Sequence, residues 1–431
     1  MLPDEARSLS QRERSFLNEL ILGTVRWLSL LEWLVERRLD KTKKRSFMDF
    51  KSFILVGAYQ LLFLHGIPDH AAINETVEAV KKSGLYGCVG IVNAILRRIA
   101  REREEIMNRE IPSLPLHLRH AHPSWMVSRW LDRLGPMATE ALLNANNERP
   151  PLTLRVNPMK IKRDVFLKLL RKEGIEARPG RFSPEAVIIH RRMPPRLITG
   201  IEQGLFYVQD EAFQSVTHLL DVRPGERVLD ACAGVGGKST HIVQLMRGKG
   251  ELWAFEPNAQ RRKLLLENLN VHAGGAPMKI VVPEEGDVLR GVKRGSIGYF
   301  DRILVDAPCS GLGVIRRHPD IKWNRRIEVI EKLAEMQLEL VETVSRVLKP
   351  GGRLVYATCT NEPEETDDVV RAILSRDCGL VPVTMDAPGS IEELRKEREG
   401  EGEQANQGHC LSGRPPETDG FFAAVFTLGT R

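Results

Sequence analysis

The fold of this chain is decided by the stretch Val228-Leu229-Asp230-Ala231-Cys232-Ala233-Gly234-Val235-Gly236-Gly237-Lys238, which has the pattern of a strand that turns through glycines into a helix. Glycines at such a turn let a ligand approach the backbone closely, and the helix that follows offers free N–H groups at its start. The same pattern occurs where the turn is only structural. The strands on either side are therefore needed to decide between a ligand-binding loop and a structural turn.

Short apolar strands alternate with helical patterns from about residue 216 onward. The strand-like stretches read ERVLDAC, GELWAFE, KIVV, FDRILVDAP, GRLVYATC and FFAAVFTL. This alternation predicts a mostly parallel sheet with helices on both faces. The segment from Glu393 to Glu417, rich in Glu, Gly, Arg and Pro, is expected to be a mobile surface loop.

Acidic residues end the strands that follow the glycine loop. Glu256 ends the second strand, Asp287 follows the third and Asp306 ends the fourth. A loop and three acids at the carboxyl edge of a sheet form the layout of an adenosine site. The glycines lack the GxGxxG spacing of dinucleotide sites, and Cys232 stands where a Walker loop needs glycine. S-adenosylmethionine is therefore the predicted cofactor, and an accidental P-loop resemblance is the alternative.

Two of the six cysteines follow neighbouring strands of the predicted sheet. Cys309 lies in Asp-Ala-Pro-Cys-Ser-Gly and Cys359 in Ala-Thr-Cys-Thr, so both are expected at the edge that holds the glycine loop. Cys232 and the remaining cysteines are interpreted as packing residues. The cysteine spacing fits neither a disulfide framework nor a zinc knuckle, and no metal site is predicted.

Methylation of carbon 5 of cytosine gives a chemical reason for these thiols. That carbon is a poor nucleophile until a thiolate adds to carbon 6 and converts the ring to an enamine. The reaction needs a reactive thiol, a carboxylic acid at nitrogen 3 and a second proton-transfer group. Asp306, Cys309 and Cys359 supply these three types of group.

Upstream of the sheet the pattern is helical, then mixed. With 431 residues, two or three domains are expected. An apolar stripe that includes Phe16, Leu31 and Leu34 predicts helices, and the basic run from Arg97 to Arg103 fits either a solvated helix face or an RNA-facing patch. The stretches PPLTLRVNP, KRDVFLKLLRKEG and AVIIH predict a strand, a helix and a strand of a small α/β module.

The bulk properties agree with a polyanionic partner without requiring one. The net charge is +6, no stretch approaches the length of a membrane helix, and the N-terminus MLPDEARSLS lacks a signal pattern. A cytoplasmic protein that does not contact a membrane, and that is a monomer, is expected.

The quoted motifs resemble the NOL1/NOP2/Sun family of RNA cytosine-C5 methyltransferases, and within it the bacterial subgroup that acts on 16S rRNA. The resemblance is carried by LDACAGVGGKS, VDAPCSG, IRRHPDIKW, LKPGGRLVYATCT, PEE and DGFF, with HPSW, NERPPLTLRVNP, FYVQDEAFQ, RSFLNELILGTVRW, VGAYQLLFL and IPDHAAINETVEAVK upstream. It spans nearly the whole chain. It implies a multidomain protein: an all-α NusB-like RNA-binding domain over 1–140, an α/β connecting module over 141–215 and a Rossmann-like class I methyltransferase domain over 216–431.

The resemblance also implies roles for single residues. Cys359 becomes the attacking nucleophile and Cys309 the group that helps release the product, although DNA cytosine methyltransferases use the cysteine of the Pro-Cys motif as nucleophile, so swapped roles are the competing assignment. The implied cofactor-binding residues are Cys232, Ala233, Gly234, Val235, Gly236, Gly237, Lys238, Glu256, Asp287 and Asp306. The family loop usually has Ala-Pro where Gly234 and Val235 stand, and Asp is commoner at the position of Glu256. The N-terminal part is shorter than the family pattern, which implies that the first helix of the NusB-like domain is missing.

The segment from Arg316 to Trp323 follows the Pro-Cys motif and combines guanidinium, ammonium and aromatic groups. Such groups neutralise phosphates and stack on bases, so this segment is predicted to contact RNA next to the thiol, while a basic surface loop with Trp323 packed inward is the alternative. Two other functions compete with the RNA methyltransferase: a non-catalytic RNA-binding factor and a DNA cytosine methyltransferase. The intact thiols argue against the first, and the cysteine of the Thr-Cys motif against the second.

Overall fold

The computed structural model describes residues 9–39, 47–190, 193–376, 378–383, 410–413 and 418–429. The chain divides into two compact units. The first contains residues 1–148 together with 315–324, and the second contains 149–314 together with 325–431. A short segment from the C-terminal half of the sequence thus belongs to the helical unit.

Helices build the first unit. They are α1 (Gln11–Arg26), α2 (Leu28–Arg38), α3 (Phe47–Phe63), α4 (Asp69–Lys82), α5 (Val89–Arg101), α6 (Arg103–Glu105), α7 (Leu116–Arg119), α8 (Ser124–Asn147) and α14 (Ile321–Asn324). Their core contains Leu31, Leu34 and Phe50, which are fully buried, so the predicted helices are confirmed. Phe16 was predicted to share this core and does not: it is 43% exposed, because α1 turns only its C-terminal part inward.

The second unit begins with a small antiparallel sheet. Its elements are β1 (Leu152–Val156), α9 (Arg163–Lys172), β2 (Ala177–Pro179), β3 (Ala186–Ile189) and β4 (Phe206–Val208), and its strand order is β2-β3-β1-β4. Phe166 and Leu170 of α9 are fully buried in the core of this sheet. The predicted strand, helix and strand are confirmed, whereas β2 and β4 were not predicted.

A larger sheet forms the rest of this unit. Its strands are β5 (Arg227–Asp230), β6 (Glu251–Ala254), β7 (Lys279–Val281), β8 (Phe300–Asp306), β9 (Leu348–Thr358), β10 (Leu380–Pro382), β11 (Cys410–Gly413) and β12 (Phe421–Leu428). The order is β10-β12-β9-β8-β5-β6-β7, with β11 paired to β12. Strands β5 to β9 run parallel, and β12 runs antiparallel to β9. All six predicted strands are present.

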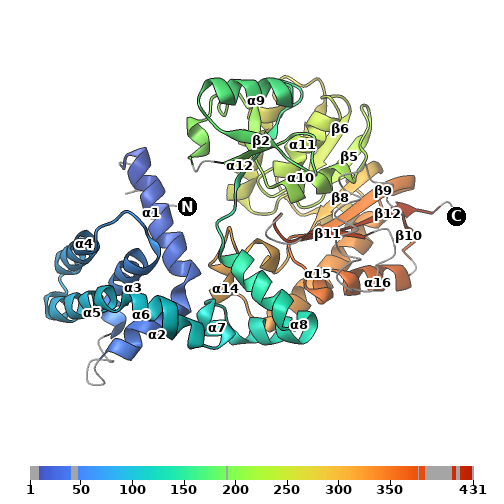
Figure 1. The fold of residues 1–431 in the computed structure, drawn as a ribbon. Coiled ribbons are helices and arrows are strands. Elements are labelled where there is room, and N and C mark those ends of the chain that lie inside the picture. Colours follow the sequence, from blue (N-terminus) through green and yellow to red (C-terminus); the bar gives the residue numbers. More distant parts are fainter. Residues whose placement is uncertain are drawn as a thin grey trace. The chain divides into compact units, whose positions relative to one another are not determined.

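Helices cover both faces of this sheet, as the alternating pattern predicts (Figure 1). One face packs against α10 (Glu211–His218), α11 (Gly237–Leu245) and α12 (Ala259–Ala273), and the other against α13 (Val288–Lys293), α15 (Ile327–Ser345) and α16 (Asp367–Ser375). In the sheet, β6 and β7 lie on one side of β5, and β8, the next strand in the sequence, lies on its other side. Ligands of open α/β sheets bind where the strand order reverses in this way, here at the carboxyl ends of β5 and β8.

Most of the expected surface loop from Glu393 to Glu417 lies outside the described residues. Its residues Cys410–Gly413 are an exception, because they form strand β11, and Cys410 and Leu411 are buried. The loop expectation is wrong for these four residues, since pairing with β12 stabilises a strand that has too few residues to show a period. Within the described ranges, no helix is long and apolar enough to cross a membrane.

Candidate active site

The glycine loop lies between β5 and α11, as predicted. Gly234 and Gly236 have φ values of 56° and 92°, a left-handed conformation that glycine adopts without strain. A side chain at Gly236 would meet Leu265 at 2.7 Å, whereas the space beside Gly234 is open. The Ala233 N–H donates to the Phe255 carbonyl at 2.8 Å, which ties the loop to the end of β6. The loop is thus held from one side and open to a ligand on another.

Two of the predicted acids lie in adjoining loops. Glu256 is buried after β6, and its Oε1 accepts a hydrogen bond from the Asn258 N–H at 2.7 Å. Asp287 caps the N-terminus of α13 through the Leu289 and Arg290 N–H groups. The backbone of Gly286 packs so closely on the Glu256 carbonyl that a Cβ there would approach it to 2.2 Å. The structure therefore brings Glu256 and Asp287 together, although the Asp287 carboxylate already serves as a helix cap.

The third acid forms an ion pair with the lysine of the glycine loop. Lys238 Nζ lies 2.6 Å from Asp306 Oδ2, and it also lies 4.7 Å from the centre of the Phe213 ring. Cys232 packs beside these groups: burial raises the pKa of its thiol well above the ordinary value, and the charges of Asp230, Asp306 and Glu256 add to the increase. A thiol of this kind stays protonated, which agrees with the predicted packing role.

Asp230, at the end of β5, was not among the predicted site residues. It is fully buried, its Oδ2 accepts a hydrogen bond from Ser239 Oγ at 2.6 Å, and its Oδ1 has no hydrogen-bond partner. Burial raises the pKa of this carboxyl to about 6. The signal that could have identified it is its position as the acid that ends the first strand of the sheet, directly before the glycine loop.

The two predicted thiols meet at the carboxyl ends of β8 and β9. Cys309 Sγ lies 3.0 Å from Cys359 Sγ, and the Cys359 N–H donates to Cys309 Sγ at 3.2 Å. The side-chain hydrogen bond between the two sulfurs raises the pKa of the Cys309 thiol well above the ordinary value, and burial and the charge of Cys359 add to this. The neutral form of Cys309 is therefore favoured. The sequence prediction that these cysteines lie at one edge of the sheet is confirmed.

A buried carboxyl that sequence reasoning did not select supports the thiol loops. Glu365 is fully buried, and its Oε1 accepts hydrogen bonds from the Ser310 N–H at 2.8 Å and from Gln337 Nε2 at 3.0 Å. Burial raises its pKa. Gln337 also donates to the Pro308 carbonyl at 2.9 Å. Glu365 thus fixes the backbone on both sides of Cys309, and its only sequence signal is its place in the Pro-Glu-Glu motif.

Backbone contacts connect the two thiol loops to the start of β12. The Gly313 N–H donates to the Cys359 carbonyl at 3.0 Å, and the Gly420 N–H donates to the Gly313 carbonyl at 2.8 Å. A Cβ at Gly313 would approach the Gly420 carbonyl oxygen to 2.3 Å, so both positions require glycine. The Asp-Gly-Phe-Phe motif therefore contributes to the framework around the thiols.

The predicted RNA-contacting segment belongs to the helical unit, and its buried side chains include those of Arg316 and Lys322. Lys322 is fully buried, and its Nζ donates to the carbonyls of Arg26 and Ala121 at 3.1 Å and to Asn147 Oδ1 at 2.7 Å. Trp323 donates from Nε1 to the Val25 carbonyl at 2.8 Å. Arg316 is also buried. The prediction that Arg316 and Lys322 face RNA is wrong, because both side chains are buried. The alternative is confirmed in part: Trp323 is half-buried and bonds inward to Val25, but the basic residues do not form a surface loop.

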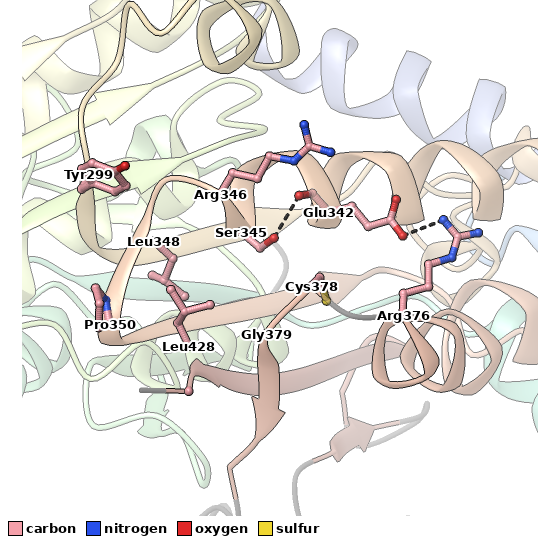
Figure 2. Close-up of a pocket in the computed structure, with 11 residues that line it drawn as sticks. Tyr299, Glu342, Ser345, Arg346, Leu348, Pro350, Arg376, Cys378, Gly379 and Leu428 are labelled. Atoms are coloured by element: carbon pink, nitrogen blue, oxygen red, sulfur yellow. Dashed lines mark hydrogen bonds and ion pairs between the residues drawn. The ribbon is translucent and has the colours of Figure 1, made fainter. Parts of the chain in front are cut away.

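A pocket of about 680 Å³ lies elsewhere on the second unit (Figure 2). It is lined by Tyr299, Leu348, Leu428 and, beside the Glu342–Arg376 ion pair, Cys378. Tyr299 and Leu348 stand at the amino ends of β8 and β9, whereas the thiols follow the carboxyl ends. The pocket is therefore at the opposite edge of the sheet from the candidate active site.

The comparisons with known proteins agree with this geometry. Residues 217–427 match the family described as 16S rRNA methyltransferase RsmB/F, residues 122–195 match the ferredoxin-like domain of RsmF/B-like methyltransferases, and residues 2–101 match the NusB family. The predicted fold class, with a NusB-like helical part, a small α/β module and a methyltransferase part, is confirmed.

Individual relatives extend the match to nearly the whole chain. The ribosomal RNA small subunit methyltransferase B of Cronobacter sakazakii is 37% identical over 407 residues, which cover 93% of this chain and 92% of that protein. Among solved structures, that of PH0851 aligns with a TM-score of 0.79 at 22% identity, and the alignment covers 98% of this chain and 92% of the PH0851 chain. NSun6 from Pyrococcus horikoshii, crystallised with SFG, aligns with a TM-score of 0.59 at 20% identity, and the alignment covers 72% of this chain and 100% of the NSun6 chain. With 37% identity over this length, the chain belongs to the RsmB/F family of 16S rRNA methyltransferases.

Proposed function

We propose that this protein transfers a methyl group from S-adenosylmethionine to carbon 5 of a specific cytosine in 16S rRNA, through a covalent adduct between the base and Cys359. The family establishes ribosomal RNA methylation as the activity. The single observation that carries the finer proposal is the pair of thiols 3.0 Å apart at the edge of the sheet that also holds the glycine loop. A ribosomal RNA substrate implies action in the cytoplasm.

The residues around the glycine loop fit S-adenosylmethionine. The open space beside Gly234 lets a ligand reach the backbone, and Asp230 Oδ1 is a buried acceptor without a donor. We assign Cys232 to Lys238 to the loop that cradles the cofactor, Glu256 to the ribose hydroxyls, Asp287 to the adenine edge and Asp306 to the far end of the site. When bound, S-adenosylmethionine supplies an electrophilic methyl group on a sulfonium centre.

We assign attack to Cys359 and assistance to Cys309. A nucleophile must be a thiolate, and the hydrogen bond and burial that keep Cys309 neutral disfavour it in that role. Cys309 instead offers its S–H to Cys359 Sγ, which stabilises the negative charge on Cys359 before attack and again when that sulfur leaves. This assignment disfavours the swapped roles that DNA cytosine methyltransferases exhibit.

The proposed steps balance as follows. The Cys359 thiolate adds to carbon 6, and the electron pair of the 5,6 double bond becomes available at carbon 5. Carbon 5 forms the new bond to the methyl group as the bond between that methyl and the sulfonium sulfur breaks, and the electron pair of the broken bond stays on the sulfur, which leaves as a neutral thioether. The proton on carbon 5 then passes to a base, its electron pair restores the double bond, and Cys359 leaves as the thiolate. The Asp306 carboxylate, ion-paired with Lys238, is suited to accept a hydrogen bond from nitrogen 3 once that nitrogen carries a proton.

The test is methyl transfer from labelled cofactor to unmodified small-subunit rRNA, with denaturing gels for covalent RNA adducts. We expect Cys359→Ala to be inactive and free of adduct, and Cys309→Ala to accumulate an adduct. The reverse pattern assigns attack to Cys309. Transfer to DNA but not to RNA, or no transfer by the unmodified protein to any RNA, contradicts the proposal.

The three-part division at 1–140, 141–215 and 216–431 is also a proposal. It is supported by the change from helices to the small sheet near Leu152 and by the start of the large sheet at Arg227. Limited proteolysis tests it. Because residues 140 and 215 lie within α8 and α10, cleavage is expected in the segments that follow these two helices and should release stable fragments. We further propose a monomer, which sedimentation analysis of the purified chain tests directly.

A further inference from the structure

Three side chains that the methyl-transfer reaction does not use converge in the second unit. Glu185 stands directly before β3, His218 ends α10 and His241 lies in the middle of α11. His218 Nε2 is 2.7 Å and His241 Nε2 3.8 Å from Glu185 Oε2. One ligand atom from each residue lies within 4.8 Å of the others. These residues are far apart in the sequence, and only the tertiary fold brings them together.

The ring nitrogens of His241 are available as ligand atoms in this cluster. Its ring is fully buried, and neither ring nitrogen has a hydrogen-bond partner. A buried imidazole normally satisfies at least one nitrogen, because an unpaired buried polar atom costs about 1–3 kcal/mol. Gln244, one turn further along α11, is also buried with both amide atoms unpaired. The packing thus leaves buried polar atoms without a hydrogen bond on the face of α11 that carries His241, 3.8 Å from the Glu185 carboxylate.

We propose that Glu185, His218 and His241 form a binding site for a divalent transition-metal ion of the zinc class, separate from the methyl-transfer site. Two imidazoles and one carboxylate are a ligand set that Zn²⁺ takes in proteins, with a fourth position for water. Around a tetrahedral ion with bonds of about 2.0–2.2 Å, ligand atoms lie roughly 3.4 Å apart. The 2.7 and 3.8 Å distances bracket that value, so small side-chain rotations complete the site.

One neighbouring cation opposes the ion and limits its affinity. Arg155 is fully buried, and its charge acts on both His241 and Glu185. Its guanidinium is already fixed by Gln209, the Gly237 carbonyl and Thr240 Oγ1. We therefore expect binding that is weaker than that of an all-cysteine structural zinc site.

The ion would connect the small sheet to the helix that starts at the glycine loop. His241 lies one turn after Gly237 and Lys238, while Glu185 stands directly before β3. Binding a metal across these elements stabilises the folded protein and fixes the start of α11. The proposal stands on this geometry alone, and it does not depend on which RNA base is methylated.

The experiment uses the full chain without an affinity tag, in a Cys309→Ser/Cys359→Ser background so that the paired thiols do not bind metal. After removal of metals with a chelator, Zn²⁺ is titrated by calorimetry, and the thermal midpoint is measured with and without Zn²⁺. We expect one Zn²⁺ per chain and a higher midpoint. Binding should weaken at least tenfold in His218→Gln and in Glu185→Gln. The control His190→Gln changes an exposed histidine directly after β3 and should bind like the parent.

Cobalt spectroscopy keeps the proposal testable if a variant fails to fold. Co²⁺ bound to the parent background is expected to give visible bands of a four-coordinate site without a thiolate charge-transfer band. No binding by the parent, equal binding by the parent and both folded variants, or a thiolate band overturns the proposal. A crystal grown with Zn²⁺ that shows only water between the three side chains overturns it as well.

Discussion

The stretch from Asp306 to Trp323 contains two short regions that the structure places in different surroundings. Asp306 to Gly311 ends a strand and brings Cys309 to 3.0 Å from Cys359 at the edge of the sheet. Arg316 to Trp323, only a few residues later, belongs to the helical unit, where Arg316 and Lys322 are fully buried. Both regions are rich in polar, chemistry-bearing residues. The comparison teaches that position after a strand, and not residue type, separates the region proposed to be reactive from the structural one.

The largest expected effect separates the two regions by activity. Cys359→Ser should lower methyl transfer at least about 1,000-fold, because oxygen is a far weaker nucleophile, while the free energy of unfolding stays within about 0.5 kcal/mol. Transfer rates and urea denaturation of the same preparation measure both quantities. Near-normal activity would remove Cys359 from the nucleophile role.

The second prediction tests the structural region. Lys322→Met removes the donor of three buried acceptors and should cost about 2–4 kcal/mol of unfolding free energy. Burial and the charge of Arg26 hold the pKa of Lys322 well below its ordinary value, so some of the loss is offset by removing a buried charge. His318→Ala, exposed in the same segment, is the control. A variant with unchanged stability and weaker RNA binding would restore the RNA-contact interpretation.

A third prediction uses pH to sharpen the description of the active-site region. Burial raises the pKa of Asp230 to about 6 from its ordinary 3.8. The folded protein therefore binds the Asp230 proton more tightly than the unfolded chain does. As the pH rises from about 4 to 6, the buried carboxyl lowers the free energy of unfolding increasingly, and above pH 6 this loss is constant. Two pKa units correspond to about 3 kcal/mol at most.

Asp230→Asn removes that cost while an amide oxygen still accepts from Ser239. We expect a higher unfolding free energy at pH 8 and no gain at pH 4, whereas the exposed Asp320→Asn should change neither. Denaturant titrations at the two pH values measure this. An equal change in unfolding free energy at both pH values would mean that the buried charge of Asp230 does not destabilise the folded protein.

The smallest expected effect concerns the support beneath Cys309. Glu365→Ala leaves the Ser310 N–H and Gln337 without their acceptor, and a displaced thiol loop should lower kcat about tenfold with little change in the KM for cofactor. Glu365→Gln keeps one oxygen in place and is expected to retain most of the activity. Comparable losses in both variants would point to the carboxyl group itself acting in proton transfer.

Much of the fold could be predicted because local patterns were strong. Six of the eight strands of the large sheet, the glycine loop and the thiol pair all follow from apolar runs that end in marked residues. The strands β2, β4 and β11 are about as short as β5 to β7, but they could not be predicted because they do not belong to a regular alternation of apolar runs and helices. Glu365 and Asp230 were missed because a single carboxyl says nothing about its burial until its neighbours are in place.

The sequence by itself determined the order of strands and helices, the position of the glycine loop and the placement of Cys309 and Cys359 at one edge of the sheet. These properties depend on local periodicity and on the rule that parallel strands end at a common edge. The tertiary structure alone decided that Lys322 is buried, that Glu365 supports Cys309, and that Glu185, His218 and His241 meet. Burial and long-range contact depend on how distant segments pack, and that packing is not written in any one stretch of the chain.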